Sequence, residues 1–166
     1  VINGIIFMEK VPFTFYGLEK IKLELDNLKK IERPNVIQAI TAAREHGDLK
    51  ENAEYHAAKE KQAFIEGRIT ELEDVTSRAE VIDLSRLSGE TVTFGARVNI
   101  IDEENDQKTN YQIVGPYEAN LEEGLISIAS PIAKAMIGKE EGVSIVVTTP
   151  SGTKHYEILS IEIPKS

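Results

Sequence analysis

The chain has 166 residues, 41% of them hydrophobic, which is enough for one or two small domains that each bury a core. The absence of cysteine excludes disulfide bonds and thiolate catalysis, and a net charge of −9 argues against holding free nucleic acid by phosphate neutralisation. No apolar run approaches the length that crosses a bilayer, so we expect a cytoplasmic protein without membrane contact.

The negative charge is concentrated toward the C-terminus. Residues 1–86 carry 13 basic and 16 acidic side chains, whereas residues 87–166 carry 6 basic and 12 acidic ones. Any contact with RNA or DNA must therefore be local or organised by a partner. The first seven residues, VINGIIF, have neither a basic region nor a cleavage site and do not form a signal peptide. We interpret residues 1–7 as an N-terminal extension and Met8 as the natural start.

From Thr14, a predicted N-cap, to about residue 79, apolar residues recur at the alternating spacing of three and four that is typical of a coiled coil. Two arms of about 30 residues, each about 45 Å long, are expected. Pro34 interrupts the first arm and predicts a kink there. The predicted seam consists of Leu18, Ile21, Leu25 and Leu28, less regularly Ile31, Ile37 and Ile40, and then Ala58, Gln62, Ile65, Ile69, Leu72, Thr76 and Ala79 in the second arm.

His46-Gly47-Asp48 is the strongest break between the two arms. A short connection between long helices makes them antiparallel neighbours, and Gly47 suits the left-handed position just after a helix. We therefore predict a coiled-coil domain over residues 8–82 with its tip at 46–52.

After about Val81 the pattern changes to β-branched and aromatic residues with partial alternation, which predicts strands. A loop at 102–107 and a hairpin turn at 149–152 separate some of them. Ser130 as N-cap, Pro131 at the first position and Gly138 past the end predict one short helix. Residues 83–166 should form a small antiparallel α+β domain. The predicted strands are 91–101, 110–114, 125–129, 143–149 and 155–163.

Asp48 and Glu51 lie three residues apart at the predicted tip, and two interpretations of them are open. Spacing alone favours a capping box, in which the two carboxylates bond to backbone amides at the start of the second helix. Capping uses only part of the bonding capacity of a carboxylate, however. Two carboxylates at the end of a long prong also match what Mg²⁺ takes from a protein when a partner supplies its other ligands.

Three separate motifs of this chain, which follow one another as they do in the family, resemble those of the bacterial Gre transcript-cleavage factors of the GreA type. They are GDLKENAEYHAA at 47–58, SPIAKAMIGKEEG at 130–142, and the pattern from Thr14 to Leu28 that includes Gly17, Ile21, Glu24 and Leu25. The resemblance extends from Met8 to about Ile163. It implies a coiled coil that enters the secondary channel of RNA polymerase and an FKBP-like C-terminal domain that docks on the channel rim.

The same resemblance assigns roles to residues of the tip. Asp48 and Glu51 are implied to hold a second Mg²⁺ together with the polymerase, which then cleaves the 3′ end of backtracked RNA. Arg44 and Lys59 are implied to form a basic patch that touches this RNA, although two solvated surface charges would look the same in the sequence. Lys59 stands where related sequences often have arginine, which keeps the charge and loses bidentate contact.

Other residues receive supporting roles or none. Leu49, Asn52 and Tyr55 are expected to support the tip, with Tyr55 packing across the hairpin rather than stacking on a base. The resemblance places Ser130 and Pro131 near the polymerase contact. His46 and His56 have no third ligand in view and do not predict a metal site.

The overall prediction is an accessory factor without an active site of its own. We expect a monomer that binds no cofactor alone and takes Mg²⁺ only in the polymerase complex. Two alternatives are a prolyl isomerase, for which the C-terminal half has few aromatic residues, and an inhibitor that blocks the channel. The intact Asp48-Leu49-Lys50-Glu51-Asn52 favours cleavage over inhibition.

Overall fold

The computed structural model describes residues 9–165, so the predicted extension at 1–7 and the predicted start at Met8 lie outside the described residues. The chain forms two compact units. One contains Glu19–Ala79, and the other combines Lys10–Leu18 with the chain from Glu80 onward. No helix of the described part is long and apolar enough to span a membrane.

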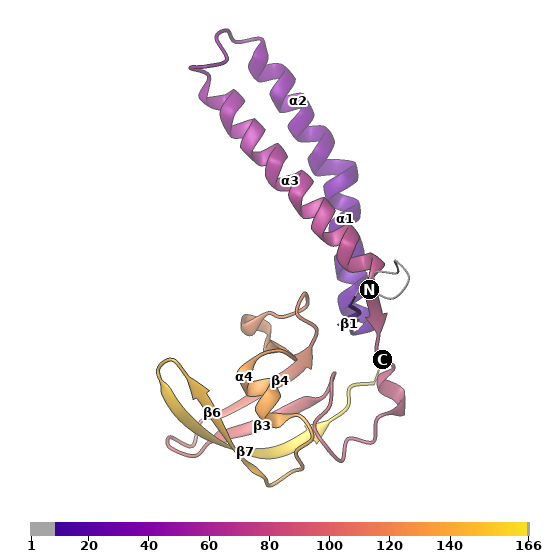
Figure 1. Cartoon of the computed structure of the whole chain (residues 1–166), viewed down its shortest axis with the longest axis vertical. Coiled ribbons are helices and arrows are strands. Elements are labelled where there is room, and N and C mark those ends of the chain that lie inside the picture. Colours follow the sequence, from indigo (N-terminus) through magenta and orange to yellow (C-terminus); the bar gives the residue numbers. More distant parts are fainter. Residues whose placement is uncertain (1–8, 166) are drawn as a thin grey trace, which may run out of the picture. The chain divides into compact units, whose positions relative to one another are not determined.

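The first unit is the predicted antiparallel helical hairpin (Figure 1). Its first arm contains helix α1, a short π-helical segment η1 and helix α2, and its second arm is the single helix α3, with α2 and α3 side by side (Figure 1). The bounds are Phe15–Asn27 for α1, Leu28–Glu32 for η1, Arg33–Arg44 for α2 and Ala53–Ser77 for α3.

A kink is predicted at Pro34, and the structure has a π-helical segment directly before this residue. Proline has no amide hydrogen and crowds the preceding turn, and a π turn relieves this because the Arg33 N–H bonds five residues back to the Leu28 carbonyl. The wider turn shifts the seam. The predicted seam residues Ile31 and Ile37 are wrong, since both are about half exposed. The positions that are buried instead are Val36 and Ala43, together with the predicted Ile40.

The seam of α3 follows the prediction more closely. Ile65, Ile69 and Leu72 are buried as expected, and Val75 is fully buried beside the half-buried Thr76. Ala79 is a correction, because α3 ends at Ser77 and Ala79 begins strand β2.

Bidentate ion pairs tie the two arms together along their flanks. Arg33 donates to both carboxylate oxygens of Glu66 at 2.7 and 2.8 Å, and Arg68 donates to both of Glu24 at 2.7 and 3.1 Å. The Arg33 guanidinium lowers the pKa of Glu66. Forked pairs of this kind fix direction as well as distance, so they help to hold the two helices in register.

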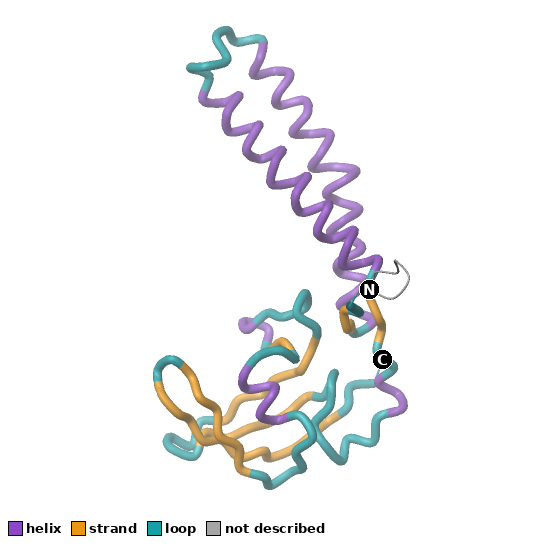
Figure 2. Tube along the Cα trace, in the orientation of Figure 1, coloured by secondary structure: helices purple, strands orange, loops and turns teal. Residues whose placement is uncertain are grey.

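The second unit contains a five-stranded sheet in the order β5-β4-β3-β7-β6. Its strands are drawn in orange in Figure 2. Its strands are β3 (Arg97–Asp102), β4 (Lys108–Val114), β5 (Leu125–Ser127), β6 (Ser144–Thr149) and β7 (Gly152–Glu162). The loop after β3 and the turn between Thr149 and Gly152 are confirmed.

Two details of the predicted sheet are wrong. Strand β5 pairs with β4 in parallel, so the sheet is not purely antiparallel. The first predicted strand also begins too early, because residues 91–96 are irregular, with a turn at 94–95, and β3 starts only at Arg97. Gly95 explains the delay: its φ of +83° belongs to the left-handed region, which glycine occupies without strain and which breaks a strand.

The predicted short helix is α4 (Pro131–Met136), which lies within the curve of the sheet (Figure 2). The Ser130 side chain accepts a hydrogen bond from the Ala133 amide, and Gly138 follows with a φ of +78°. Ala133 and Met136 are fully buried against the inner face of the sheet. The inward residues of the strands include Val98, Ile100, Ile113, Ile145, Val147 and Ile158.

The sequence did not predict that the residues before and after the hairpin would pair. Strand β1 (Val11–Phe13) and strand β2 (Ala79–Val81) form a separate two-stranded sheet. Phe13 is fully buried and stacks on Tyr117 with ring centroids 6.5 Å apart. This pairing brings residues 10–18 into the C-terminal unit.

The start of α1 is capped by two side chains rather than one. Thr14 is the predicted N-cap and accepts a hydrogen bond from the Gly17 amide at 3.0 Å. Glu118 accepts from the Thr14 amide at 2.6 Å and from the Thr14 hydroxyl at 2.8 Å. Burial raises the pKa of Glu118, against the two hydrogen bonds from Thr14, which lower it.

Candidate functional site

The connection between α2 and α3 is a loop whose helix cap differs from the expected one. Helix α3 begins at Ala53, and its N-cap is Asn52, whose side-chain oxygen accepts from the Tyr55 amide at 3.0 Å. Asp48 accepts from the Lys50 amide within the loop. The capping-box interpretation of Asp48 and Glu51 is therefore wrong, because asparagine four residues further on takes that role.

Asn52 joins the two helices at the tip. While its oxygen caps α3, its side-chain nitrogen donates to the Ala43 carbonyl near the end of α2 at 2.7 Å. His56 adds a second constraint, since its Nε2 lies 3.1 Å from the Lys50 carbonyl. The histidine contact had no signal in the sequence, because it depends on the path of the loop. Together these bonds fix the loop that carries Asp48 and Glu51.

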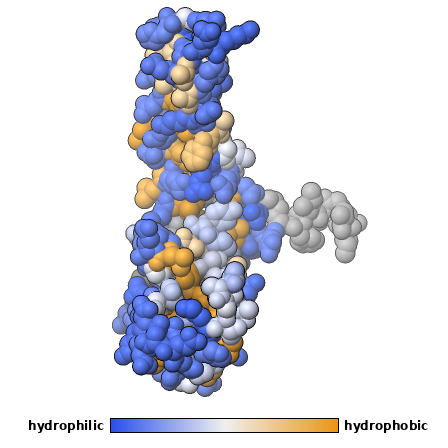
Figure 3. Space-filling view, turned by 90° about the vertical axis from the view of Figure 1, so that its left-hand side faces the viewer, coloured by the Kyte–Doolittle hydropathy of each residue, from blue (hydrophilic) through white to orange (hydrophobic). Residues whose placement is uncertain are grey.

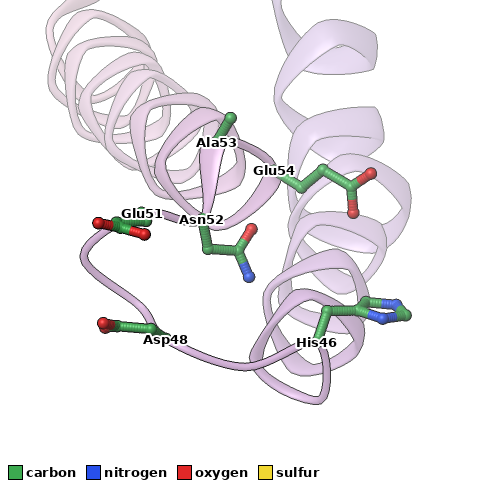
Figure 4. Close-up of a pocket in the computed structure, with 6 residues that line it drawn as sticks. All are labelled: His46, Asp48, Glu51, Asn52, Ala53 and Glu54. Carbon is green, nitrogen blue, oxygen red and sulfur yellow. The ribbon is translucent and has the colours of Figure 1, made fainter.

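The two tip carboxylates project to the same side of the loop, away from Asn52 (Figure 4). Both side chains are exposed, and they line a shallow hollow of about 450 Å³ together with His46, Asn52, Ala53 and Glu54. Within residues 9–165 Glu51 forms no hydrogen bond or ion pair, and Asp48 uses one oxygen for the Lys50 amide. Most of the bonding capacity of the pair is therefore directed outward.

The surroundings of this pair suit a hard cation only if another molecule completes the coordination. Carboxylate oxygens are the ligands that Mg²⁺ prefers, and one or two of them are its usual share from a protein. In the described part of the chain, no cluster of three or more histidine, aspartate and glutamate side chains could hold a metal ion. The end of the hairpin is covered mainly by hydrophilic residues (Figure 3).

The predicted basic residues lie on one flank of the hairpin behind the tip. The Arg44 guanidinium carbon lies 5.8 Å from the centroid of the half-buried Tyr55 ring, so the arginine stacks across the hairpin. Lys59 is four residues beyond Tyr55 on α3, which places both on the same helix face. The Lys59 ammonium donates to Gln62 at 3.2 Å. The structure thus brings Arg44, Tyr55 and Lys59 to one surface.

The other predicted residues occupy separate places. Leu49 is 40% exposed in the tip loop. Ser130 caps α4 and Pro131 is exposed at its first position, in the C-terminal unit. His46 points away from the tip carboxylates (Figure 4).

The fold and the tip together define a class of protein. It is a two-unit chain in which a helical hairpin presents an outward-facing pair of acidic side chains, followed by a curved sheet with one short helix.

The chain belongs to the GreA/GreB family of transcription elongation factors. The family model for the N-terminal part, "Transcription elongation factor, N-terminal", matches residues 11–81. The model "Transcription elongation factor, GreA/GreB, C-term" matches residues 87–163. Together they span nearly all of the described chain.

Two curated relatives support this assignment, and one solved structure is a weaker match that adds nothing to it. The chain is 61% identical over 154 residues to transcription elongation factor GreA of Rhodospirillum rubrum, which covers 93% of this chain and 98% of that protein. It is 60% identical over 155 residues to GreA of Ruegeria pomeroyi, with 93% and 99% covered. The crystal structure of GreA factor homolog 1 (Gfh1) of Thermus thermophilus is 29% identical, covers 93% and 99% of the two chains and has a TM-score of 0.43.

Proposed function

We propose that this chain binds bacterial RNA polymerase, inserts its helical hairpin into the secondary channel and stimulates the polymerase to cleave the 3′ end of backtracked RNA. Cleavage leaves a new 3′ end in register and so rescues arrested elongation complexes. Membership of the elongation factor family supports the proposal. The observation that carries the proposal is the position of Asp48 and Glu51 (Figure 4). Both lie in the loop before α3, on one side of the tip, and most of their carboxylate oxygens have no hydrogen-bond donor among residues 9–165.

The proposed chemistry divides the work between the two proteins. Asp48 and Glu51 would hold Mg²⁺ together with the polymerase, and the bound ion would stabilise the charge that develops on the reacting phosphodiester. The role of this chain is to deliver two carboxylates in a fixed geometry. Asn52 supports that geometry because it bonds to both α2 and α3. The reaction pocket belongs to the polymerase, so the factor alone has no nuclease activity.

We assign the remaining predicted residues to contacts within this complex. Arg44 and Lys59 lie on the flank where an extruded RNA strand would pass the tip, and Tyr55 holds the arginine in place. Leu49 meets the channel wall, while Ser130 and the exposed Pro131 belong to the docking surface of the C-terminal unit. The factor acts as a monomer, in the cytoplasm with its polymerase.

The decisive experiment uses stalled, backtracked elongation complexes with Mg²⁺ and scores short 3′ fragments. Asp48→Asn and Glu51→Gln keep the size of each side chain and remove its charge. We expect cleavage to fall by roughly 100-fold or more, because a lost metal ligand exceeds the 10- to 100-fold effect of an outer-shell change. The thermal stability of both variants and their affinity for polymerase should equal those of the parent within experimental error, since neither carboxylate caps α3.

Glu54→Gln is the matched control. Glu54 lines the same hollow, but its carboxylate points away from the other two (Figure 4). We expect this variant to cleave like the parent. Parental cleavage by both Asp48→Asn and Glu51→Gln would refute the proposal, and cleavage by the factor without polymerase would refute the division of work. A factor that binds polymerase and only inhibits it would favour the channel-blocking alternative.

A further inference from the structure

His56 makes a contact at the tip to which the proposed function assigns no role. Its imidazole Nε2 lies 3.1 Å from the carbonyl oxygen of Lys50. A carbonyl oxygen only accepts hydrogen bonds, so Nε2 carries a proton and is the donor. His56 belongs to the first turn of α3, a helix of 25 residues, and therefore connects the loop to a rigid element.

The imidazole is held in place by its own neighbours. The His56 amide donates to the Asn52 carbonyl at 3.1 Å, which closes the first turn of the helix. The ring meets Tyr55 edge to face, with ring centroids 5.6 Å apart. Tyr55 in turn lies 5.8 Å from the guanidinium carbon of Arg44 on the other arm. The histidine therefore loses little further freedom when it bonds to the loop.

The two peptide groups that flank Lys50 are held by different side chains. The Lys50 amide donates to the Asp48 side chain at 3.0 Å. The Lys50 carbonyl belongs to the next peptide group, whose nitrogen is that of Glu51, and His56 holds this carbonyl. Because a peptide group is planar, a bond to its oxygen restricts the direction of the whole group. Asp48 is thus oriented by its own bond, whereas Glu51 depends on His56.

Glu51 depends on the backbone because its side chain is not anchored. Within residues 9–165 its carboxylate forms no hydrogen bond or ion pair, and it projects to the same side of the tip as Asp48 (Figure 4). The backbone is fixed on both sides of it, by Asn52 after it and by the bond to the Lys50 carbonyl before it. Metal ligands act only within about 0.5 Å of their productive position, so the loss of one of these bonds should reach the ion.

We propose that His56 is a positioning residue for transcript cleavage. Its hydrogen bond to the Lys50 carbonyl sets the direction of the Glu51 carboxylate, and the imidazole itself contacts neither the RNA nor the ion. This inference rests on the proposed function, since His56 acts through Glu51. Outer partners that orient metal ligands contribute about 10- to 100-fold to affinity or activity. The bond is exposed to solvent, so we expect the lower end of this range.

The test compares three variants of His56 in backtracked elongation complexes with Mg²⁺ and saturating factor. The amide nitrogen of glutamine reaches the position of the histidine Nε2, whereas that of asparagine falls short of it. His56→Gln should therefore cleave within about threefold of the parent, while His56→Asn and His56→Ala should lose roughly tenfold. Polymerase affinity should stay at the parental value in all three. If His56→Ala is unstable, the Gln and Asn variants still decide the test, because they differ only in reach.

His46→Ala is the matched control. His46 is the other histidine near the tip, but its ring points away from the two carboxylates (Figure 4). We expect this variant to cleave like the parent. A cleavage defect as large as that of His56→Ala would overturn the inference, because loss of any imidazole near the tip would then have the same effect.

A double variant distinguishes positioning from general support of the fold. If His56 acts through Glu51, adding His56→Ala to Glu51→Gln should cost less than about twofold beyond Glu51→Gln alone. Independent losses that multiply would overturn the inference, as would parental cleavage by His56→Asn or a His56→Gln variant as defective as His56→Ala. These results leave the proposed function intact. Parental cleavage by both Asp48→Asn and Glu51→Gln would instead overturn the proposed function and this inference with it.

Discussion

The tip loop and the start of α1 use carboxylates in opposite ways. At the start of α1, Glu118 is partly buried, and each of its two carboxylate oxygens accepts a hydrogen bond from Thr14. This carboxylate therefore bonds within the chain. At the tip, Asp48 accepts a single bond from Lys50, and Glu51 accepts none from the described residues. Both regions adjoin a helix N-terminus, where negative charge is favourable.

The difference comes from which residue caps each helix. Helix α3 has its cap in Asn52, a neutral side chain that also bonds to α2. The acidic residues Asp48 and Glu51 are therefore not needed as caps of α3. At α1, Thr14 is anchored by Glu118 from a distant part of the sequence. A carboxylate that stability does not require is the one available for another molecule, and this contrast predicts which substitutions change function and which change folding.

The largest expected effect concerns Mg²⁺ and the tip. If Asp48 and Glu51 help to retain the ion, the cleavage defect of Asp48→Asn should shrink as Mg²⁺ is raised from about 0.1 to 20 mM, because mass action replaces lost affinity. We expect a defect of roughly 100-fold at low Mg²⁺ to fall to about tenfold at high Mg²⁺. Cleavage rates in backtracked complexes give the measurement. A defect that is constant across the titration would show that the carboxylate does not act through the ion.

The second effect is on stability and concerns Glu118. Glu118→Ala removes the acceptor for the Thr14 amide and hydroxyl and should lower the free energy of unfolding by about 2 kcal/mol. Glu118→Gln keeps an acceptor oxygen and should lose less than about 1 kcal/mol. Urea denaturation measures both. Equal stability of the alanine variant and the parent would show that Thr14 alone caps α1.

The third effect compares two helical glycines. Alanine normally stabilises a helix relative to glycine, and Gly67 on α3 has open space around a new Cβ, so Gly67→Ala should gain about 1 kcal/mol. At Gly17 on α1 a Cβ would collide with the Glu118 side chain, so Gly17→Ala should lose about 1–3 kcal/mol. Thermal unfolding of both variants is the measurement. A gain at Gly17 would mean that the Glu118 side chain moves aside without loss.

The sequence predicted the helices and the tip better than it predicted the helix irregularity before Pro34 and the contacts between segments far apart in the chain. The hairpin, its break at Gly47 and the short helix after Ser130 follow from local periodicity and caps, which a single sequence carries. The predicted seam residues Ile31 and Ile37 were wrong because the π-helical segment before Pro34 shifts the register of the first arm. The β1–β2 pairing and the bond between Glu118 and Thr14 join residues far apart in the sequence and left no local signal.

The candidate site shows the same limit on a smaller scale. Asp48 and Glu51 were identified as a pair, yet their spacing suggested a cap that Asn52 forms instead. Spacing cannot tell which of two good capping residues starts the helix, because both satisfy the same amide geometry. The path of the loop determines that Asn52 is the cap, because the loop also lets the Asn52 side chain donate to the Ala43 carbonyl on α2.

The smallest expected effect is a dependence of stability on pH. Because burial raises the pKa of Glu118, the folded chain holds this proton to higher pH than the unfolded chain does. The stability that this group contributes is therefore present below its ordinary pKa and is lost as pH rises through the raised one. Relative to Glu118→Gln, the parent should lose stability as the pH rises from about 4 toward neutrality. Urea denaturation of both proteins across this range is the measurement. A relative gain by the parent would mean that the two bonds from Thr14 outweigh burial and lower the pKa, which would make the carboxylate at α1 a net electrostatic stabiliser of the helix.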